Sequence, residues 1–382
     1  MPVCQFQHQR RASADRRARY YSRGVLAVNH HRRFALPEVR VTRIVLDAMG
    51  SDDRPHPEIE AARAAVARWN DPLILAGPRS RLAPLLEQGA GGAGRITIAD
   101  ASEVLEMTDK AARAARGKAD SSMAVGIELL RSGHADAFVT AGNTGGAMST
   151  ALLRLGRLRG VRRPALTALF PVRGGRAVIL DIGANVDCKA EYIVQFAVMG
   201  SVYAQVVLGI PSPRIGLISN GEEPGKGTTL IHETYPLLTT SGLNFVGNVE
   251  AKEIYAGAVD VAVTDGFTGN VFLKTSESVA RFLTELIREE ITSGPLTAVG
   301  GLLARPAFTR VRRLLDPAEY GAAPLLGLNG LVFVGHGRSD ARALVNAIGA
   351  ARAAAEAGLL EALRRALEPY LVRHAVGAPA VE

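Results

Sequence analysis

Cysteine is almost absent from this chain, which has 382 residues but only Cys4 and Cys188. Two thiols are too few for a disulfide framework, and such sparing use is typical of a reducing cytoplasm. No two histidine or cysteine residues have the spacing of metal ligands, which argues against a tightly held transition metal. We therefore expect a protein that works without a metal or another cofactor.

Acidic residues are scarce in the first forty positions. Residues 1–40 contain nine arginines against Asp15 and Glu38, a net charge of +7 within the chain's total of +8. The remainder is close to neutral, so a globally basic surface for nucleic acid is not indicated. Residues 1–40 also lack an apolar stretch long enough for a signal peptide. We expect 1–40 to be a disordered basic extension, 41–375 a single α/β catalytic domain and 376–382 a tail.

Charge is missing altogether from residues 192–213, a length that could span a membrane. However, Gln195 and Gln205 interrupt the run, and Pro211 ends it early. A helix buried against a sheet or a second subunit is therefore the better interpretation.

From residue 41 onward, short apolar runs alternate with helical patterns. The runs are rich in leucine and β-branched residues and show little polar alternation, as in parallel strands buried on both faces. This pattern predicts a doubly wound, mostly parallel α/β sheet. The expected strands lie within 43–50, 72–77, 135–146, 176–185, 214–221, 244–248, 259–266 and 330–337.

Gly-rich polar turns follow most of these runs, where ligands bind in doubly wound sheets. Six of the turns, AGNTGG, DIGANVDCK, SNGEEPGKG, GNVE, TDGFTGN and GHGRSD, are expected on one rim of the sheet. One such turn means little, but six on one edge predict a binding site. We therefore expect the site along this rim.

The turn ISNGEEPGKGTT resembles a nucleotide-binding loop but fails its spacing. Gly221 and Gly225 enclose three residues instead of four, and Gly227 stands where a hydroxyl would hold Mg²⁺. The turn LDAMGSDD after the first run likewise lacks a GxGxxG fingerprint, which argues against a nicotinamide-dependent dehydrogenase. Lys226 remains a glycine-flanked cation that suits a single phosphate.

Other turns supply further candidates for the site. In AGNTGG, Asn143, Thr144 and Gly145 open a helix whose N-terminus favours an anion, although the motif alone could be only a tight turn. In DIGANVDCK, Asn185 and Lys189 suit an oxyanion or a phosphate, and structural roles are the alternative.

In DGFTGNVFLK, Asp265 could hold a lysine or orient an attacking oxygen, Asn270 stands near the helix start and Lys274 follows one turn later. His336 lies between two glycines at a strand end and is a further candidate. Cys188 could form an acyl-enzyme, but it has no neighbouring histidine in the sequence to activate it.

Between Glu277 and Leu315 the pattern becomes helical, with an apolar GPLTAVGGLLARPAF segment expected as a loop between two helices. Residues 294–315 carry four arginines and no acid. Such a protruding hairpin (277–315) could lie on an anionic membrane or pack against a second subunit.

Several long blocks together resemble one family. LDAMGSD, SSMAVGIELLRSGHADAFVTAGNTGGAM, LDIGANVDCKAEYIVQFAVMGSVYA, GLISNGEEPGKG, FVGNVEAKEI, DVAVTDGFTGNVFLKTSE and EYGAAPLLGLNGLVFVGHGRSDARALVNAI are similar to the bacterial phosphate acyltransferase of phospholipid synthesis. The blocks run from about residue 41 to residue 350. Ser51, Ala322 and Arg338 depart from the family's usual residues, which leaves the expected reaction unchanged but puts fine geometry in doubt.

The resemblance implies transfer of a long-chain acyl group from acyl carrier protein to inorganic phosphate. It also implies a homodimer, a sheet of the isocitrate dehydrogenase and phosphotransacetylase type, and a cytoplasmic enzyme held peripherally at the cell membrane. There a membrane glycerol-3-phosphate acyltransferase would be its partner, which favours a membrane role for the hairpin.

Under this hypothesis Lys226 neutralises phosphate, Asn270 and Asn143 position it or the carbonyl, and Asp265 and His336 orient groups or move a proton. Thr144, Gly145, Asn185, Lys189 and Lys274 complete the expected substrate-binding set. A short-chain phosphotransacetylase, a dehydrogenase and a non-catalytic scaffold are the competing interpretations.

Overall fold

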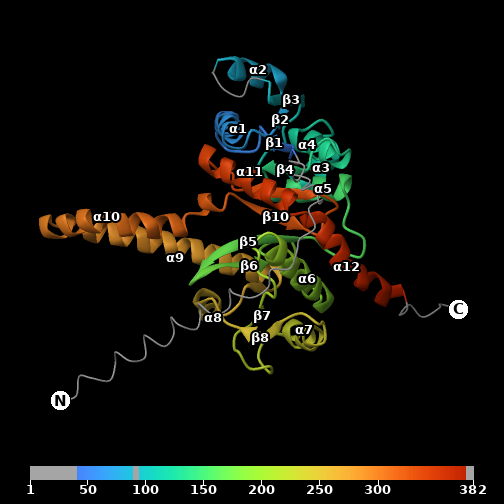
Figure 1. The fold of residues 1–382 in the computed structure, drawn as a ribbon, viewed down its shortest axis with the longest axis vertical. Helices are drawn as coiled ribbons and strands as arrows, with labels where there is room; N and C mark the ends of the chain where they lie inside the picture. The colour runs from blue at the N-terminus through green and yellow to red at the C-terminus, as the bar shows by residue number, and fades with distance from the viewer. Residues whose placement is uncertain (1–40, 89–93, 376–382) are drawn as a thin grey trace, which may run out of the picture. The chain divides into compact units, whose positions relative to one another are not determined.

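The structure is a computed structural model that describes residues 41–88 and 94–375 (Figure 1). Within these residues, eleven strands join in one sheet of order β3-β2-β1-β4-β11-β10-β5-β6-β9-β7-β8. The strands are β1 (Ile44–Asp47), β2 (Leu73–Gly77), β3 (Ile96–Asp100), β4 (Ala137–Thr140), β5 (Ala165–Val172), β6 (Gly175–Leu180), β7 (Ile215–Ile218), β8 (Phe245–Val249), β9 (Val261–Val263), β10 (Ala322–Leu326) and β11 (Leu331–Gly335).

All eight strands expected from the sequence are present, and the doubly wound α/β class is confirmed. The sequence pattern missed β3, β5 and β10. Two of these, β5 and β10, form the antiparallel centre of the sheet, and β3 is an edge strand whose residues are only partly buried. None of the three carries the continuous buried run that marks a parallel strand.

Helices cover both faces of the sheet. They are α1 (His56–Trp69), α2 (Arg79–Glu87), α3 (Ala111–Gly117), α4 (Ser122–Arg131), α5 (Thr144–Arg154), α6 (Ala190–Val206), α7 (Thr229–Thr239), α8 (Ala251–Ala256), α9 (Gly266–Thr292), α10 (Pro295–Leu315), α11 (Ala341–Glu356) and α12 (Leu359–Ala375), with a 3₁₀ turn at Pro317–Glu319. Alternate residues of one strand therefore enter different cores. Ile44 and Leu46 of β1 pack in the core with α1, α6, α11 and α12, whereas Val45 packs with α4 and α5.

Residues 192–206 of the uncharged segment lie in α6, most of whose residues are buried, as expected for a core helix. Among the described residues, no single helix is long and apolar enough to cross a membrane. The bent pair of α11 and α12 reaches that length and composition only jointly, with an angle of 53° between its parts.

The sheet changes direction at its centre, which overturns the expectation of a single rim. β1, β2, β3, β4 and β11 run parallel to one another, and so do β6, β7, β8 and β9. Three antiparallel pairings, β11 with β10, β10 with β5 and β5 with β6, separate the two groups. Three reversals leave the groups antiparallel, so their carboxyl ends lie at opposite edges of the sheet.

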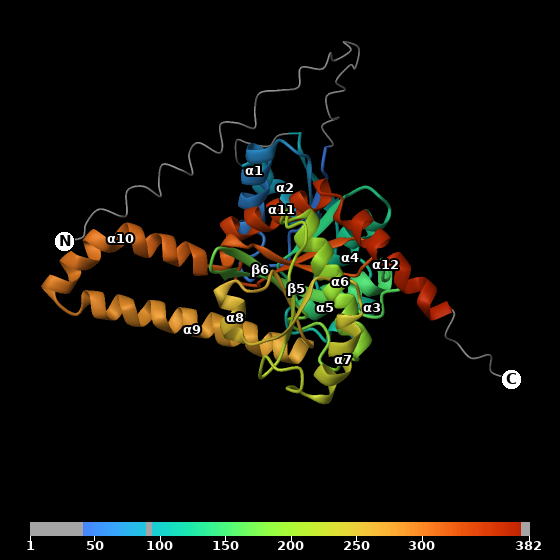
Figure 2. The same cartoon turned by 60° about the horizontal axis from the view of Figure 1, so that its bottom comes forward.

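Helices α9 and α10 pack against each other and project from the body of the domain as a hairpin (Figures 1 and 2). The segment expected as an apolar loop is instead helical: α9 continues to Thr292, and α10 begins at Pro295. A proline at the first helical position suits this restart, because its missing N–H would be unpaired there anyway.

Candidate functional site

The carboxyl end of β6 holds a buried carboxylate, Asp181, which the sequence analysis did not select as a site residue. Asp181 is fully buried. Burial raises its pKa, and hydrogen bonds from the turn that follows oppose this shift. Its two oxygens accept bonds from the backbone of Ala184, at 3.0 Å, and of Asn185, at 2.7 Å. Asp181 therefore shapes the 181–185 turn and is not exposed to a substrate.

Asn185 has its amide hydrogens engaged within the same turn. Its Nδ2 donates to Asp181 Oδ2 at 2.8 Å and to the carbonyl of Pro164 at 2.7 Å. Its own carbonyl accepts the N–H of Gly266, the first residue of α9, at 2.7 Å. These contacts favour the structural alternative for Asn185, which joins the β6 turn to β5 and α9.

Asp265 is the N-cap of α9 rather than a free base. Its Oδ1 accepts the N–H of Thr268 at 2.9 Å and its Oδ2 accepts the Thr268 hydroxyl at 2.7 Å. This capping satisfies helix donors that would otherwise be unpaired. The carboxylate thus orients α9, and through α9 the exposed amide of Asn270, whose Nδ2 donates to the carbonyl of Ile182 at 3.2 Å.

We call Asp181, Asn185, Asp265 and Asn270 the Asp181 cluster. Its close packing depends on Gly269, because a Cβ there would lie 1.9 Å from the carbonyl oxygen of Asp181. The first turn of α9 can therefore press directly on the β6 turn.

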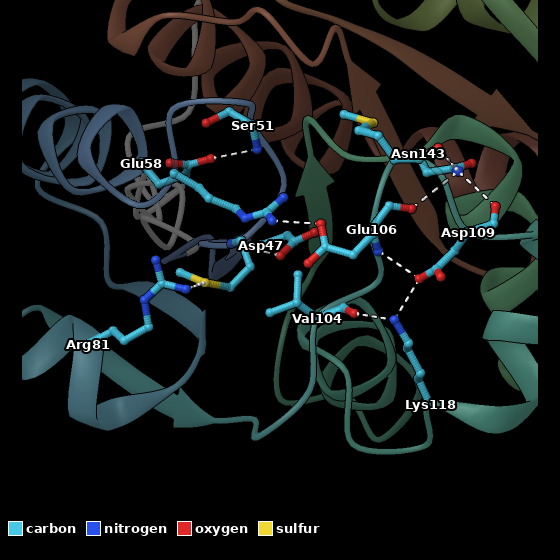
Figure 3. A network of polar contacts seen from close by, with 12 residues as sticks. Asp47, Ser51, Glu58, Arg81, Val104, Glu106, Asp109, Lys118 and Asn143 are labelled. Carbon is cyan, nitrogen blue, oxygen red and sulfur yellow. Dashed lines mark hydrogen bonds and ion pairs between the residues drawn. The ribbon is translucent and has the colours of Figure 1, made fainter.

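At the opposite edge, β1, β4 and β11 end side by side. Asn143 follows β4 and caps α5, with Oδ1 accepting the N–H of Gly146 at 2.9 Å. Its Nδ2 donates to the carbonyl of Met107 at 2.9 Å and lies within reach of two neighbouring carbonyls (Figure 3). Asn143 thus holds the 106–109 loop, and Thr144 and Gly145 begin α5 with Thr144 exposed.

His336 follows β11 and is exposed, but its pKa is lowered by its surroundings. Partial loss of hydration lowers the pKa of the imidazole below 6.5, and the positive charges of Arg338 and Lys274 lower it further. The negative charges of Glu277 and Asp52 oppose these effects. The backbone N–H of Arg338 donates to Nδ1 at 3.3 Å, which leaves the proton of the neutral ring on Nε2.

Helix α9 begins at the Asp181 cluster, and the positive charge of Lys274 on this helix is one of those that lower the pKa of His336. Asn270, Lys274 and Glu277 are spaced three or four residues apart and so share one side of α9, and Lys274 Nζ lies 2.9 Å from Glu277 Oε2. We call these residues the α9 stripe. The stripe begins at the Asp181 cluster, and its eight residues advance about 11 Å along the helix. The charges of Lys274 and Glu277 both act on the pKa of His336.

Two predicted cations remain free. Lys226 lies beyond β7, is exposed, and makes no side-chain hydrogen bond or ion pair among residues 41–88 and 94–375. Its backbone is held by Glu223, and its carbonyl by Asn248 at 3.5 Å. Lys189, the N-cap of α6, is also exposed and unpaired within the described part of the chain. Both are therefore available to an anion, although no contact joins Lys226 to the α9 stripe in this structure.

Sequence reasoning also missed a buried acid beside β1. Glu58 of α1 is fully buried, and its Oε1 accepts the N–H of Ser51 at 2.9 Å (Figure 3). Burial raises the pKa of Glu58 to about 7. Its Oε2 and the Ser51 hydroxyl have no hydrogen-bond partner among the described atoms. The only available signal was a glutamate at an otherwise apolar position of a helix.

Glu58 supports the 50–54 loop, which contacts the turns that follow β4 and β11. A Cβ on Gly50 would lie 2.8 Å from the N atom of Ala141, and the N–H of Asp52 donates to the carbonyl of Gly337 at 2.8 Å. Arg54 of the same loop pairs with Glu106 at 2.6 Å. This loop therefore positions the backbone around His336.

Cys188 does not have the properties of a nucleophile. Burial and, to a smaller extent, nearby carboxylates raise the pKa of its thiol to about 11, so the reactive thiolate is rare near neutral pH. Covalent catalysis through Cys188 is accordingly disfavoured.

Among the described residues, one group of acids lies close enough together to hold a cation: Glu222, Glu250 and Glu253. Lys252 Nζ already lies 3.0 Å from Glu222 and from Glu250, and 3.5 Å from Glu253. The lysine balances the negative charge, so this group is better explained as an ion-pair network.

Comparisons with known proteins place this arrangement in a family. The family model described as "Fatty acid synthesis protein" matches residues 42–362. A phosphate acyltransferase of Acidobacterium capsulatum is 48% identical over 324 residues, covering 85% of this chain and 96% of the relative. The chain belongs to the phosphate acyltransferase family. A second phosphate acyltransferase, from Myxococcus xanthus, is 48% identical over 330 residues and covers 85% and 93% of the two chains. The protein is thus an acyltransferase, as the resemblance implied.

Solved structures support the fold of this phosphate acyltransferase family member. The EutD phosphotransacetylase from Staphylococcus aureus superposes with a TM-score of 0.52 at 16% identity, covering 83% of this chain and 94% of that chain. A branched-chain phosphotransacylase from Enterococcus faecalis gives 0.51 at 12% identity, with coverages of 82% and 99%. At such identities the likeness establishes the sheet architecture alone.

Proposed function

We propose that the protein transfers a long-chain fatty acyl group from acyl carrier protein to inorganic phosphate. A phosphate oxygen attacks the thioester carbonyl carbon, the C–S bond breaks, and the carrier thiolate leaves and takes up a proton. The product is an acyl phosphate, and the reaction is reversible. The name shared by the relatives supports this acceptor, and the α9 stripe is the structural observation that carries the proposal.

The α9 stripe offers what this chemistry needs. Attack on a thioester requires a desolvated anion held about 3 Å from the carbonyl and donors for the oxyanion. In our proposal Lys226 neutralises phosphate, Asn270 positions it and Lys274 contributes a second positive charge. The N-terminus of α5 at Thr144 and Gly145, together with Lys189, supplies further anion-binding donors.

His336 completes the proposed site with a neutral imidazole. Nδ1 accepts a backbone bond, so Nε2–H is left to donate to an oxyanion or to phosphate. In this proposal, three residues act indirectly by fixing the loops and the helix that carry the donors: Asn143, Asn185 and Asp265. A thiolate is a good leaving group, so the site does not require a strong general acid.

We also propose that the hairpin of α9 and α10 associates with a second copy of the chain or with a membrane surface, which would make the protein a cytoplasmic, peripherally bound homodimer. Many large apolar side chains on the hairpin are exposed, and Leu296, Leu302 and Leu303 are 85%, 67% and 79% exposed. Such a surface is rare on a monomer unless something covers it. A membrane glycerol-3-phosphate acyltransferase would then receive the acyl phosphate.

The test is deacylation of purified long-chain acyl carrier protein with and without phosphate. We expect acyl phosphate to form only when phosphate is present, and the carrier to be preferred over a short-chain acyl-coenzyme A. Equal use of the short-chain donor would identify a phosphotransacetylase-like activity instead. Release of free fatty acid without phosphate would contradict the proposal.

A further inference from the structure

The loop between α5 and β5 is the most basic short segment of the described chain outside the proposed site. Residues 154–163, RLGRLRGVRR, contain five arginines and no acid. Four of these side chains are exposed, and none of the four has an ion-pair partner within the described residues. We call them the arginine loop: Arg157, Arg159, Arg162 and Arg163.

Hydrogen bonds to neighbouring elements fix the backbone of the arginine loop. Gln195 of α6, itself buried, accepts the N–H of Arg162 on Oε1 at 2.8 Å and donates from Nε2 to the carbonyl of Gly160 at 2.9 Å. The N–H of Leu158 also donates to the carbonyl of Gly327 at 2.9 Å. This clamp explains why a polar glutamine interrupts the apolar α6.

A fixed loop presents its charges at low entropic cost, because little backbone freedom remains to be lost on binding. The loop also lines a hollow of about 430 Å³, whose walls include Leu152 and Arg159. Arg157 and Arg159 line this hollow, and Arg162 and Arg163 follow in the same exposed loop. The loop therefore offers a concave, positively charged surface to an acidic side chain.

The arginine loop leads directly into the Asp181 cluster. Pro164 follows Arg163, and its carbonyl accepts Asn185 Nδ2 at 2.7 Å. Two residues further, the N–H of Leu166 donates to Asp181 Oδ1 at 3.0 Å. A partner bound on the loop therefore sits beside the start of the α9 stripe.

The arginine loop lies on a different side of the domain from the hairpin tip, so it would not contact a membrane bound through that tip. Figures 1 and 2 both show α5 and α6, which flank the loop, on the side of the domain away from the tip of α9 and α10. One flat membrane that contacts the hairpin tip would therefore leave this side free. Charge and position favour a soluble acidic partner here.

We propose that the arginine loop is the docking surface for an acidic face of acyl carrier protein, placing the thioester beside the α9 stripe. This inference rests on the proposed function, since it assumes that donor. Unpaired charges at the rim of an interface act mainly by steering association, so they lower KM more than they alter the chemical step.

The test compares the double variant R159E/R163E with the matched control R68E/R95E. Each variant reverses two exposed arginines, and Arg68 and Arg95 lie on α1 and just before β3, away from the loop. Because Arg68 stacks over the Trp69 ring and Arg95 donates to the Asn70 carbonyl, the melting temperatures of both variants are compared with that of the wild type first. We expect R159E/R163E to raise KM for acyl carrier protein about tenfold or more with little change in kcat. Turnover of a small acyl-pantetheine thioester should be unchanged in both variants, and the control should match the wild type with both donors.

Direct binding of the carrier protein to each variant separates this inference from the proposed function. If the wild type binds the carrier and R159E/R163E does not, the docking surface stands even if no acyl phosphate forms. Unchanged binding and KM in R159E/R163E would overturn the inference while leaving the reaction intact. Loss of binding to anionic vesicles, with carrier binding unchanged, would assign the loop to a membrane and also overturn it.

Discussion

Individual polar residues in this protein divide into those that hold the site and those that remain available to a substrate. Asn143, Asn185 and Asp265 are occupied by hydrogen bonds to backbone or capping groups. Lys226 and Lys189 are exposed and unpaired among the described residues. Residue type alone does not distinguish the two classes, because an amide or carboxylate suits a cap as well as a ligand.

Lys226→Ala tests the proposed phosphate ligand. We expect phosphate-dependent acyl transfer to fall roughly 100-fold or more, because removing one preorganised donor has effects of that size. Steady-state kinetics at varied phosphate would measure the loss, and an unchanged melting temperature would show that the exposed side chain is not structural. Full activity in the variant would remove Lys226 from the site.

Glu58→Gln tests the buried acid. The pKa of Glu58 is raised from 4.5 to about 7. Its contribution to stability is therefore fully present below pH 4.5 and is lost as the pH rises through 7, because only the unfolded state ionises freely in between. Glutamine keeps an acceptor for the Ser51 N–H but does not titrate.

We expect the free energy of unfolding of the wild type to fall relative to Glu58→Gln by about 3 kcal/mol between pH 4.5 and pH 8. Denaturant unfolding of both proteins across this range measures the difference. If the free energies of unfolding of the wild type and of Glu58→Gln change with pH in the same way, the pKa of Glu58 is not raised in the folded protein.

At the scale of elements, α9 has two tasks that its sequence combines in one helix. Its first turns carry Asn270 and Lys274 from the Asp181 cluster towards His336, and its later turns form half of the exposed hairpin. The first turns of α9 need small residues because they pack closely against β6, whereas its later turns carry exposed apolar side chains.

Gly269→Ala should break the contact between α9 and β6. The new Cβ would lie 1.9 Å from the Asp181 carbonyl oxygen, which is backbone and cannot rotate away. We expect a loss of about 2 kcal/mol or more in stability, together with reduced activity. Gly300→Ala in α10 is the matched control: no atom lies within 4 Å of its Cβ, so it should be neutral or stabilising. Thermal melts of both variants decide this.

Leu303→Glu tests the hairpin surface. The side chain is 79% exposed, so we expect no change in melting temperature but weaker self-association or weaker binding to anionic vesicles. Sedimentation and vesicle flotation measure the two alternatives. Thr284→Glu on α9 adds the same charge at an exposed polar position and should leave both unaffected. If Leu303→Glu behaves like this control in both assays, the hairpin face has neither role.

At the scale of the whole molecule, the family match begins at residue 42 and the first strand at Ile44. The predicted disordered extension at 1–40 and tail at 376–382 lie outside the described residues. We expect a chain starting at residue 41 to keep the melting temperature and acyl-transfer rate of the full chain. Calorimetry and the phosphate-dependent assay compare the two, and a clear loss in either would show that the extension contributes to the fold or the site.

The sequence alone determined the α/β class, eight strands, the buried α6 and the family. These depend on local periodicity and on long matching blocks, which one chain displays directly. The residues at strand ends were also visible as candidates because glycine and polar residues mark the turns.

Only the tertiary structure decided how those turns are arranged. The antiparallel pairings through β5 and β10 make the two groups of parallel strands run in opposite directions. No local sequence pattern predicts such pairings, because they join segments far apart in the sequence. The same is true of Gln195 beneath the arginine loop and of Glu58 beneath Ser51, whose roles exist only where distant elements meet. Because burial and long-range hydrogen bonds set which polar groups stay free, the candidate site could be proposed from sequence but divided into ligands and supports only in three dimensions.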